Sequence, residues 1–371
     1  MKLTIEREPL LKALGHVQSV VERRTTIPIL ANMLLSAGDG MLGLSATDMD
    51  LAIDEKVAAD VEQAGGITAP AHTLFDIVRK LPEGAEVALE TSADGRVDIR
   101  AGRSRFSLSA LPTEEFPAMA GGDMPHRFSI AAAELRRLID RTRFAISTEE
   151  TRYYLNGIFL HAAEAAGEPV LRAVATDGHR LARADMPLPE GAGDMPGVIV
   201  PRKAVGEVRK LVDESTDAVD IALSETRIQF SFDRVLLGSK LIDGTFPDYE
   251  RVIPTGNEKL LRIDRDGFAE AVDRVSTIST EKSRAIKLSL GQGNLTLSAS
   301  SPENGTATEE LEAGYDDEPL EIGFNSRYLL DIAGQIEGDD AQFAFADSAS
   351  PTVVLDTADA SALYVLMPMR V

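Results

Sequence analysis

A carboxylate, an imidazole and a guanidinium lie within four consecutive residues of this chain, Asp177-Gly178-His179-Arg180. In an enzyme, Asp177 or His179 could act as a general base while Arg180 holds an anion. The same residues suit a tight turn, in which the Asp177 side chain accepts hydrogen bonds from the backbone that follows. We favour the turn, and an enzyme is the alternative.

The rest of the sequence offers no pattern that predicts catalysis or a bound cofactor. The 5 histidines are dispersed without the spacing of metal ligands, and cysteine is absent, so thiolate chemistry is excluded. A GxxxxGK[ST] phosphate loop and a GxSxG nucleophile elbow are also missing from the sequence. We therefore expect no catalytic residue, no metal and no cofactor.

The elements that must position the turn belong to a repeat that occurs three times. Segments in which Leu3, Phe128 and Leu261 align share their apolar spacing, at offsets of 125 and 133 residues. A second set of segments aligns around residues 74, 205 and 329, and each reads as a short strand running into an amphipathic helix. Because a fixed internal period indicates repeated structural units, we predict three domains, at residues 1–122, 127–254 and 259–371.

Each predicted domain contains two strand–helix units followed by further strands. The helices are expected at residues 6–16, 71–81, 131–143, 201–212, 264–275 and 325–336. Asp39-Gly40 lies between two apolar runs, which predicts a hairpin. The predicted fold class is α+β, with antiparallel sheets that carry their helices on one side. Three such domains joined head to tail could close into a ring with a second copy of the chain.

The charge distribution bears on the partners of the chain. The net charge of the 371 residues is −22, which by itself argues against binding to nucleic acid. The predicted helices nevertheless sum to +4, so the remainder carries −26. Cationic helices could face DNA, or could reflect only that Lys and Arg are good helix formers. Glu6 and Glu8 occupy the region where a signal peptide needs an apolar run, and no stretch reaches transmembrane length, so we expect a cytoplasmic protein.

Two further segments have more than one interpretation. Tyr153 and Tyr154 are expected at the start of a strand, where neighbours face opposite ways; core packing is favoured for each, and an exposed ring could contact nucleic acid. The apolar C-terminus Tyr364-Val-Leu-Met-Pro-Met-Arg-Val371 suits a docked end. It could form an adaptable methionine-lined pocket or an edge strand that closes the last sheet, ended by Pro368.

Taken together and in order, seven segments resemble the bacterial DNA polymerase III beta subunits, the sliding clamps. They are RRTTIPIL, RYYLNG, ATDGHRLA, VIVPRK, SKLIDGTFPDYERVIP, EIGFN and YVLMPMR, and the similarity runs essentially from end to end. The resemblance implies a head-to-tail homodimer of three-domain chains without catalytic activity. In that family, helices line the hole of a ring around duplex DNA, and sheets form its outer rim.

The resemblance also implies functional residues. An extended partner peptide with apolar anchors would occupy a pocket. The implied pocket residues are Leu155, Thr176, Gly178, His179, Arg180, Leu181, Pro247, Val252, Asn325, Tyr328, Val365, Met367, Pro368, Met369 and Arg370. Implied partners are the clamp loader, the polymerase III alpha subunit, other polymerases, ligase and mismatch-repair proteins, each bound through a short linear motif; no membrane is implied.

Contacts with DNA and between the two copies complete the implied set. The residues implied to contact DNA are Arg24, Arg79, Tyr153, Tyr154, Arg202, Lys203 and Arg251. The residues implied at the dimer interface are Arg103, Arg105, Phe106, Leu108, Thr277, Ile278 and Glu303. The chain departs from the family at His72 and Thr73, which are often basic there, and at Glu250 beside Arg251; these changes would weaken contact with DNA. A protein scaffold with no role on DNA is the second alternative.

Overall fold

The computed structural model describes residues 1–117, 122–214, 218–279 and 284–370, and they divide into two compact units. Unit 1 comprises Met1–Arg136, Pro189–Met195 and Lys203–Leu241. Unit 2 comprises Arg137–Leu188, Pro196–Arg202 and Ile242–Val371. The central part of the chain therefore contributes to both units, and each unit is described by itself.

Unit 1 contains two antiparallel sheets. The five-stranded sheet has the order β5 (Asp60–Gln63), β1 (Lys2–Glu6), β7 (Glu86–Thr91), β8 (Arg96–Ala101) and β9 (Ser104–Ser109). The eight-stranded sheet has the order β10 (His126–Ala131), β15 (Ala218–Leu223), β16 (Arg227–Phe232), β17 (Val235–Lys240), β4 (Leu51–Ala58), β3 (Met41–Thr47), β2 (Asn32–Gly38) and β6 (Gly65–Pro70). The predicted hairpin at Asp39-Gly40 is confirmed, because it joins β2 to β3 with φ of 50° and 71°.

Unit 2 repeats this plan. Its eight-stranded sheet has the order β14 (Val198–Pro201), β11 (Gly157–Ala165), β12 (Glu168–Thr176), β13 (Arg180–Pro187), β25 (Ala362–Leu366), β24 (Thr352–Asp356), β23 (Asp340–Phe345) and β18 (Lys259–Asp264). Its four-stranded sheet has the order β21 (Gly305–Glu312), β20 (Asn294–Ser301), β19 (Ala285–Gly291) and β22 (Leu320–Asn325). The predicted fold class, α+β with antiparallel sheets, is confirmed.

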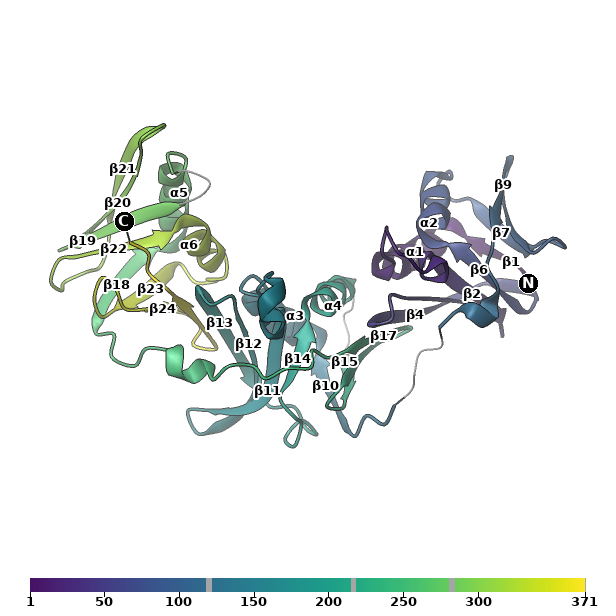
Figure 1. The fold of residues 1–371 in the computed structure, drawn as a ribbon, viewed down its shortest axis with the longest axis horizontal. Helices are drawn as coiled ribbons and strands as arrows, with labels where there is room; N and C mark the ends of the chain where they lie inside the picture. Colours follow the sequence, from purple (N-terminus) through teal and green to yellow (C-terminus); the bar gives the residue numbers. More distant parts are fainter. Residues whose placement is uncertain (118–121, 215–217, 280–283, 371) are drawn as a thin grey trace. The chain divides into compact units, whose positions relative to one another are not determined.

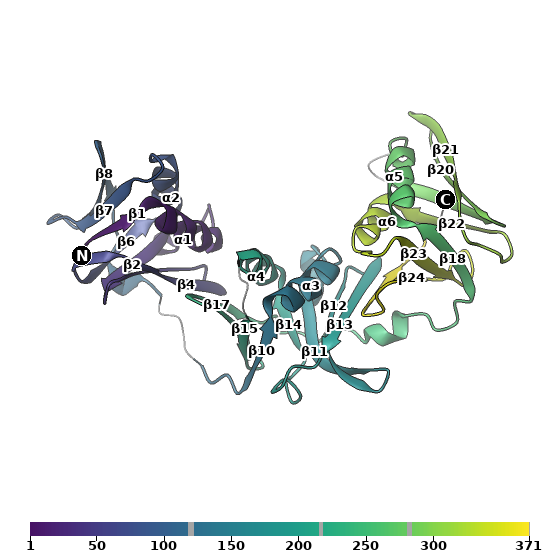
Figure 2. The same ribbon diagram turned by 180° about the vertical axis from the view of Figure 1, so that it is seen from behind.

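The helices lie where the sequence predicts them, with small shifts at their ends. They are α1 (Arg7–Val20), α2 (Ala71–Lys80), α3 (Ala132–Arg143), α4 (Arg202–Glu214), α5 (Arg265–Ser276) and α6 (Ser326–Ala333), with 3-10 turns η1 (Pro28–Ala31), η2 (Thr113–Glu115), η3 (Glu150–Leu155) and η4 (Tyr249–Val252). In α1, Leu10, Leu14 and Val17 follow the helical period and are fully buried, so one face of the helix packs on the protein. In both ribbon views α1 lies beside α2, and α5 lies beside α6 (Figures 1 and 2).

One order of elements recurs along the chain. A strand, a helix and three strands follow one another in β1-α1-β2-β3-β4, in β6-α2-β7-β8-β9, and so on to β22-α6-β23-β24-β25. By this order β4, β13 and β21 are equivalent strands, as are β9, β17 and β25. We call the pairing of β4 with β17 in unit 1 the first joint, and that of β13 with β25 in unit 2 the second joint.

Two sequence-based predictions need correction. The C-terminal strand β25 is not an edge strand, because β24 pairs with one side of it and β13 with the other. Tyr153 and Tyr154 do not begin a strand; they lie in η3, ahead of β11. Across this turn Arg152 forms two hydrogen bonds with the Glu149 carboxylate, at 2.6 and 2.8 Å.

Candidate functional site

The turn between β12 and β13 is held by its own side chains. Asp177 Oδ1 accepts hydrogen bonds from the backbone N–H of His179 at 2.9 Å and of Arg180 at 3.0 Å. Thr176 Oγ1 donates to the Arg180 carbonyl at 2.7 Å and accepts from the Gly178 N–H at 3.1 Å. Gly178 has φ of +86°, which suits glycine. The predicted Asx-type turn is therefore confirmed, and the Asp177 carboxylate is used in holding it.

Arg180 fastens this turn to its surroundings. Its guanidinium is 8% exposed and forms ion pairs with Asp177, at 3.2 Å, and with Asp331 of α6. It also donates to the carbonyl of Phe144 at 2.6 Å, and lies 4.4 Å from the centre of the Tyr328 ring and 5.0 Å from that of Phe144. Burial, with Asp177 nearby, raises the pKa of Tyr328. A buried cation with these partners fixes the turn and α6 relative to one another.

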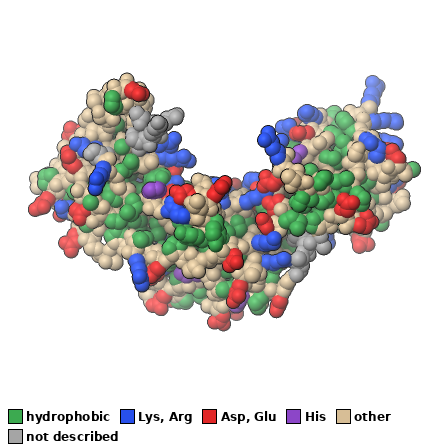
Figure 3. All heavy atoms as spheres, viewed as in Figure 1, with side chains coloured by type: hydrophobic (Ala, Val, Ile, Leu, Met, Phe, Trp, Pro, Cys, Tyr) green, Lys and Arg blue, Asp and Glu red, His purple; other side chains and the backbone are tan. Residues whose placement is uncertain are grey.

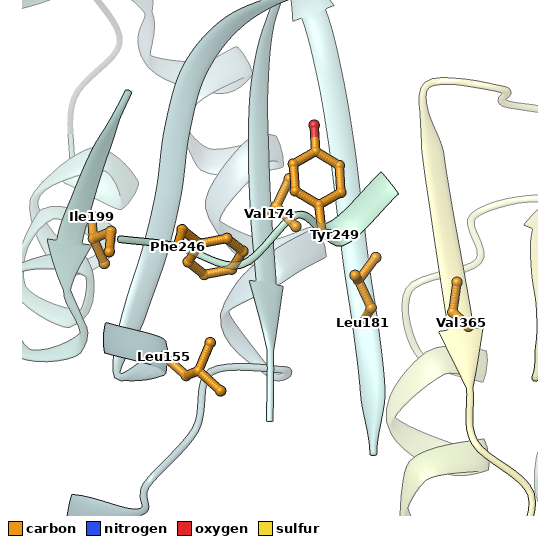
Figure 4. Close-up of a cluster of buried hydrophobic side chains, with 7 residues drawn as sticks. All are labelled: Leu155, Val174, Leu181, Ile199, Phe246, Tyr249 and Val365. Carbon is orange, nitrogen blue, oxygen red and sulfur yellow. The ribbon is translucent and has the colours of Figure 1, made fainter. Parts of the chain in front are cut away.

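Apolar side chains gather beside the turn. Leu155, Leu181 and Val365, all predicted pocket residues, belong to one buried cluster with Val174, Ile199, Phe246 and Tyr249 (Figure 4). Sequence reasoning missed Phe246, whose ring stacks on Phe159 with centroids 4.9 Å apart. Phe246 directly precedes the predicted pocket residue Pro247, and this position could have indicated that it belongs to the same region.

The C-terminal segment lies against the same turn. The backbone N–H of Met367 donates to the His179 carbonyl at 2.9 Å, and that of Met369 donates to the Gly323 carbonyl at 2.8 Å. The His179 ring stacks on Tyr328 with centroids 6.4 Å apart. These hydrogen bonds confirm that the C-terminal segment is docked.

Exposed apolar groups complete the surface of this region. Met367 is 42% exposed and Val252 is 51% exposed, which leaves both side chains available to a ligand. Pro247 is exposed as well, and Asn325 caps α6 by accepting from the Arg327 N–H at 3.0 Å. A cavity of about 1060 Å³ lies against the four-stranded sheet and is lined by Pro368, Met369 and Arg370 together with residues of β19–β22, but by none of the 176–181 turn. The arrangement offers apolar anchors beside placed polar groups, which suits binding rather than reaction.

Most residues implied to contact DNA are exposed. Arg24, Arg202 and Tyr153 are exposed, whereas Tyr154 is half-buried with its ring edge-on to Tyr153 at 5.8 Å. Two further arginines form exposed ion pairs, Arg79 with Asp76 at 2.9 Å and Arg251 with Asp248 at 2.7 Å. Such pairs contribute little to stability.

Lys203 differs from this group. Its ammonium donates to the carbonyl of Val20 at 3.0 Å and to Asp48 at 2.6 Å, and it also pairs with Glu22. Burial alone would lower the pKa of Lys203, but the bonds to Asp48 and Glu22 outweigh it and raise the pKa. Lys203 therefore stabilises unit 1 through α1 and the β3–β4 turn.

Two of the positions at which the chain departs from the family, His72 and Glu250, have partners within the chain. Both ring nitrogens of His72 are engaged, one with Gln18 at 2.8 Å and one with the Val21 carbonyl at 3.0 Å. Glu250 lies 3.3 Å from Arg172, within unit 2. His72 therefore packs against α1.

The residues implied at the dimer interface lie at two sheet edges. Arg105, Phe106 and Leu108 lie on β9, the last strand of its sheet, and Arg103 lies in the turn before it. Phe106 is 39% exposed. Glu303 lies in the turn before β21. Thr277 and Ile278 directly follow α5, and the Ile278 carbonyl accepts from the Asn304 side chain of that turn at 3.4 Å.

Three other features bear on the site: the surface charges, possible metal ligands, and the length and polarity of the helices. On the face drawn in Figure 3, Lys and Arg side chains are interspersed with Asp and Glu. Among the described residues, no three acidic or histidine side chains gather as metal ligands would. The helices of the described part of the chain are too short or too polar to cross a bilayer.

Comparison with known protein families shows to which family this repeated fold belongs. Models of the DNA polymerase III beta subunit match the chain throughout: the N-terminal domain at residues 1–120, the central domain at 129–248 and the C-terminal domain at 250–370. The chain belongs to this family, the sliding clamps, which are non-catalytic processivity factors of DNA replication.

Individual relatives agree with this assignment. The beta sliding clamp of Caulobacter vibrioides is 58% identical over 372 residues, and that of Escherichia coli K12 is 39% identical over 371, with 100% of each chain covered. Among solved structures, a Caulobacter crescentus beta sliding clamp with bound PEG has a TM-score of 0.98 at 58% identity, covering 100% of this chain and 99% of that one. A Bartonella birtlesii clamp bound to griselimycin has a TM-score of 0.98 at 51% identity, with both chains covered at 100%.

Proposed function

We propose that two copies of this clamp join head to tail into a ring that encircles duplex DNA. The observation that carries the proposal is the repeated joint. β4 pairs with β17 and β13 pairs with β25, whereas β21 and β9, the remaining members of the two equivalent sets, are both edge strands. A third joint, between β9 of one copy and β21 of the other, would complete the series and close the ring.

The chemistry of the two edges supports this pairing. β9 carries Arg105 with Arg103 beside it, and β21 carries the exposed Glu310 and Glu312, whereas Glu309 already pairs with Arg274 at 2.6 Å. Opposite charges at two edges favour one register and one partner. The exposed Phe106 adds an apolar anchor. In this proposal each chain consists of domains at 1–122, 127–254 and 259–371, which the matched family ranges support.

The native mass at micromolar concentration tests the ring. We expect twice the chain mass for the unmodified protein and the mass of one chain for Phe106→Asp. Leu260→Asp is the matched control, since Leu260 is also an exposed apolar residue, 46% exposed, on an edge strand. A single-chain mass for the unmodified protein would refute the ring.

Retention on DNA is proposed to be topological. A closed ring cannot leave a circular duplex by diffusion, so the contacts from Arg24, Arg79, Tyr153, Tyr154, Arg202, Lys203 and Arg251 need only be weak and non-specific. Weak contacts favour sliding, and the net charge of −22 discourages binding elsewhere on the surface. We expect loaded protein to remain on nicked circular DNA and to leave the same DNA after linearisation; equal retention on both would contradict the account.

Partner proteins are proposed to bind the region around the 176–181 turn through short linear motifs. The exposed Met367 and Val252 and the His179–Tyr328 stack support an extended peptide with apolar anchors. The clamp loader, the polymerase III alpha subunit, other polymerases, ligase and mismatch-repair proteins are the proposed partners, in the cytoplasm. The griselimycin complex of the Bartonella birtlesii clamp supports ligand binding by a relative.

A model peptide tests this site. The probe acetyl-Thr-Leu-Thr-Phe-Thr-amide is uncharged, its β-branched threonines favour an extended conformation, and in that conformation both apolar side chains lie on one face. We expect Met367→Ser and His179→Ala each to weaken its binding at this site at least tenfold. Leu260→Ser is the control for loss of an exposed apolar group elsewhere in unit 2, and it should bind as the unmodified chain does.

A further inference from the structure

Unit 1 contains a cavity at the first joint for which the proposed function has no use. It has a volume of about 450 Å³ and lies where the β3–β4 turn meets β17. Its lining is mostly apolar and includes Met49, Leu51, Leu236 and Pro117. Met49 is 51% exposed, so its side chain is available to a ligand at this cavity.

The turn at this cavity has the same hydrogen bonds as the turn at the proposed peptide site. Asp48 Oδ1 accepts from the N–H groups of Asp50, at 2.9 Å, and Leu51, at 2.7 Å, as Asp177 does in its own turn. Thr47 Oγ1 donates to the Leu51 carbonyl at 2.9 Å and accepts from the Met49 N–H at 3.0 Å. Met49 has φ of +82°, close to the +86° of Gly178. The two turns are repeats of one structure.

The neighbouring strands continue the correspondence. Ala52 pairs with Gly238 at the first joint, as Leu181 pairs with Val365 at the second. The N–H of Lys240 donates to the Asp50 carbonyl at 2.8 Å, in the place where the Met367 N–H meets His179. The segment beside each joint also contains the same dipeptide, Phe116-Pro117 near the first joint and Phe246-Pro247 near the second.

Smaller side chains leave room at the first joint. The positions of Leu181 and Val365, which belong to the buried cluster of the second joint, are held here by Ala52 and Gly238, both of which line the cavity. The charged lining residues are Asp50, Asp54, Arg227 and Lys240, so their formal charges cancel. Asp50 and Lys240 form an ion pair at 3.0 Å. A neutral, mostly apolar cavity favours an uncharged apolar ligand over an acidic or basic one.

We propose that this cavity is a second peptide site, which takes a bulky apolar side chain from an uncharged, extended segment of a partner protein. The inference rests on the proposed peptide site of the second joint, whose backbone the first joint repeats. Met49 and Pro117 form the apolar lip, and Ala52 and Gly238 form the floor that admits the anchor. A partner with two such segments would bind one chain at both joints, which raises its overall affinity without new contacts.

Calorimetric titration of the full-length protein with acetyl-Thr-Leu-Thr-Phe-Thr-amide tests the proposal. We expect two sites per chain. Ala52→Leu introduces the larger side chain that Leu181 has at the second joint. It should fill the first-joint cavity and leave one site per chain. Met49→Gly, which keeps the backbone conformation because glycine suits φ of +82°, should weaken the first-joint site at least threefold. Met367→Ser should abolish only the second-joint site.

The outcomes separate this inference from the proposed function. A single site per chain that Met367→Ser removes, and that Ala52→Leu and Met49→Gly leave unchanged, would overturn the second peptide site and leave the proposed function intact. A single site that Ala52→Leu removes and Met367→Ser leaves unchanged would support the first-joint site and contradict the proposed one. Thermal unfolding of Ala52→Leu checks its fold, and Met49→Gly carries the test if that variant unfolds.

Discussion

The first and second joints share a backbone and differ in how their turns are fastened. In both, a turn aspartate caps its own loop and its second oxygen accepts from a cation. At the first joint that cation is Lys203, which reaches Asp48 from α4. At the second joint it is Arg180, the first residue of β13, directly after the turn. Its guanidinium also forms an ion pair with Asp331 of α6. Both turns therefore place a cation beside this aspartate, but a different element supplies it in each.

The two joints also differ in the side chains that each offers to a ligand. Arg180 occupies the space beside its turn, and the exposed surface there is made by His179, Tyr328 and the C-terminal segment. At the first joint Leu51 stands at the equivalent position of the turn, and the room lies over Ala52 and Gly238 instead. Strand pairing uses only backbone groups, so both outcomes are compatible with one register.

The largest expected effect is at the second joint. Arg180→Ala removes a buried cation and its bonds to Asp177, Asp331 and the Phe144 carbonyl, and leaves Asp331 only the 3.9 Å ion pair with Arg327; it should destabilise unit 2 by about 3 kcal/mol. Urea unfolding of the full-length protein measures the shift. Arg327→Ala is the control, since its side chain is 63% exposed and its loss should cost less than about 0.5 kcal/mol. Equal shifts for the two variants would show that burial of Arg180 is not what stabilises the joint.

The corresponding change at the first joint should be smaller. Lys203→Ala removes hydrogen bonds to Val20, Glu22 and Asp48 from a side chain that is 35% exposed, and should cost about 1–2 kcal/mol. Urea unfolding is the measurement, together with retention on circular DNA. The neighbouring Arg202→Ala, at an exposed position, should leave stability unchanged. Lost stability with unchanged retention would remove Lys203 from the proposed contacts with DNA, and unchanged stability would contradict its structural role.

Substitution of the residue with positive φ in each turn should change the free energy of unfolding by about 1 kcal/mol, in opposite directions for the two turns. Gly178→Ala is destabilising, because φ is +86° and the added Cβ would lie 2.5 Å from Arg152 Nη1. Met49→Gly relieves the same backbone conformation at the first joint and should stabilise unit 1 slightly. The midpoints of thermal unfolding report both, and a loss of stability in Met49→Gly would mean that its side chain packs more tightly than its exposure indicates.

The smallest effect concerns pH at the first joint. His16 of α1 hydrogen-bonds Glu55 at 2.8 Å and Glu214 of α4 at 3.1 Å, and Lys12 pairs with Glu214 at 2.7 Å. Burial alone would lower the pKa of His16, but the two carboxylates outweigh it and raise the pKa above 6.5. The charged imidazole therefore stabilises unit 1 fully below pH 6.5, and this contribution is lost as the pH rises through the raised value.

A matched variant isolates this pH dependence. In His16→Gln, the decline of unfolding free energy between about pH 6 and pH 8 should become shallower, by less than about 1 kcal/mol over the range. The His161→Gln variant is a control in unit 2, where burial lowers the pKa of His161 and reverses the sign. An identical pH profile for the unmodified chain and His16→Gln would exclude the contribution.

The sequence by itself determined the local elements and the family. Helical periodicity such as that of Leu10, Leu14 and Val17 is a short-range signal, and so is turn chemistry such as that of Asp177, so both are legible in the order of the residues alone. The threefold repeat predicted the order of elements, and the matching motifs indicated the family. The three-domain borders, the site and the dimer interface stay predictions.

Only the tertiary structure decided which strands meet and which side chains share a partner. β17 pairs with β4 and β25 with β13 across long stretches of chain through backbone hydrogen bonds, which almost any side chains allow. The interior position of β25 and the bonds of Lys203 to Asp48 follow from those pairings, as does the cavity at the first joint. Sequence patterns report the face that each element buries, whereas long-range pairing sets what that face meets.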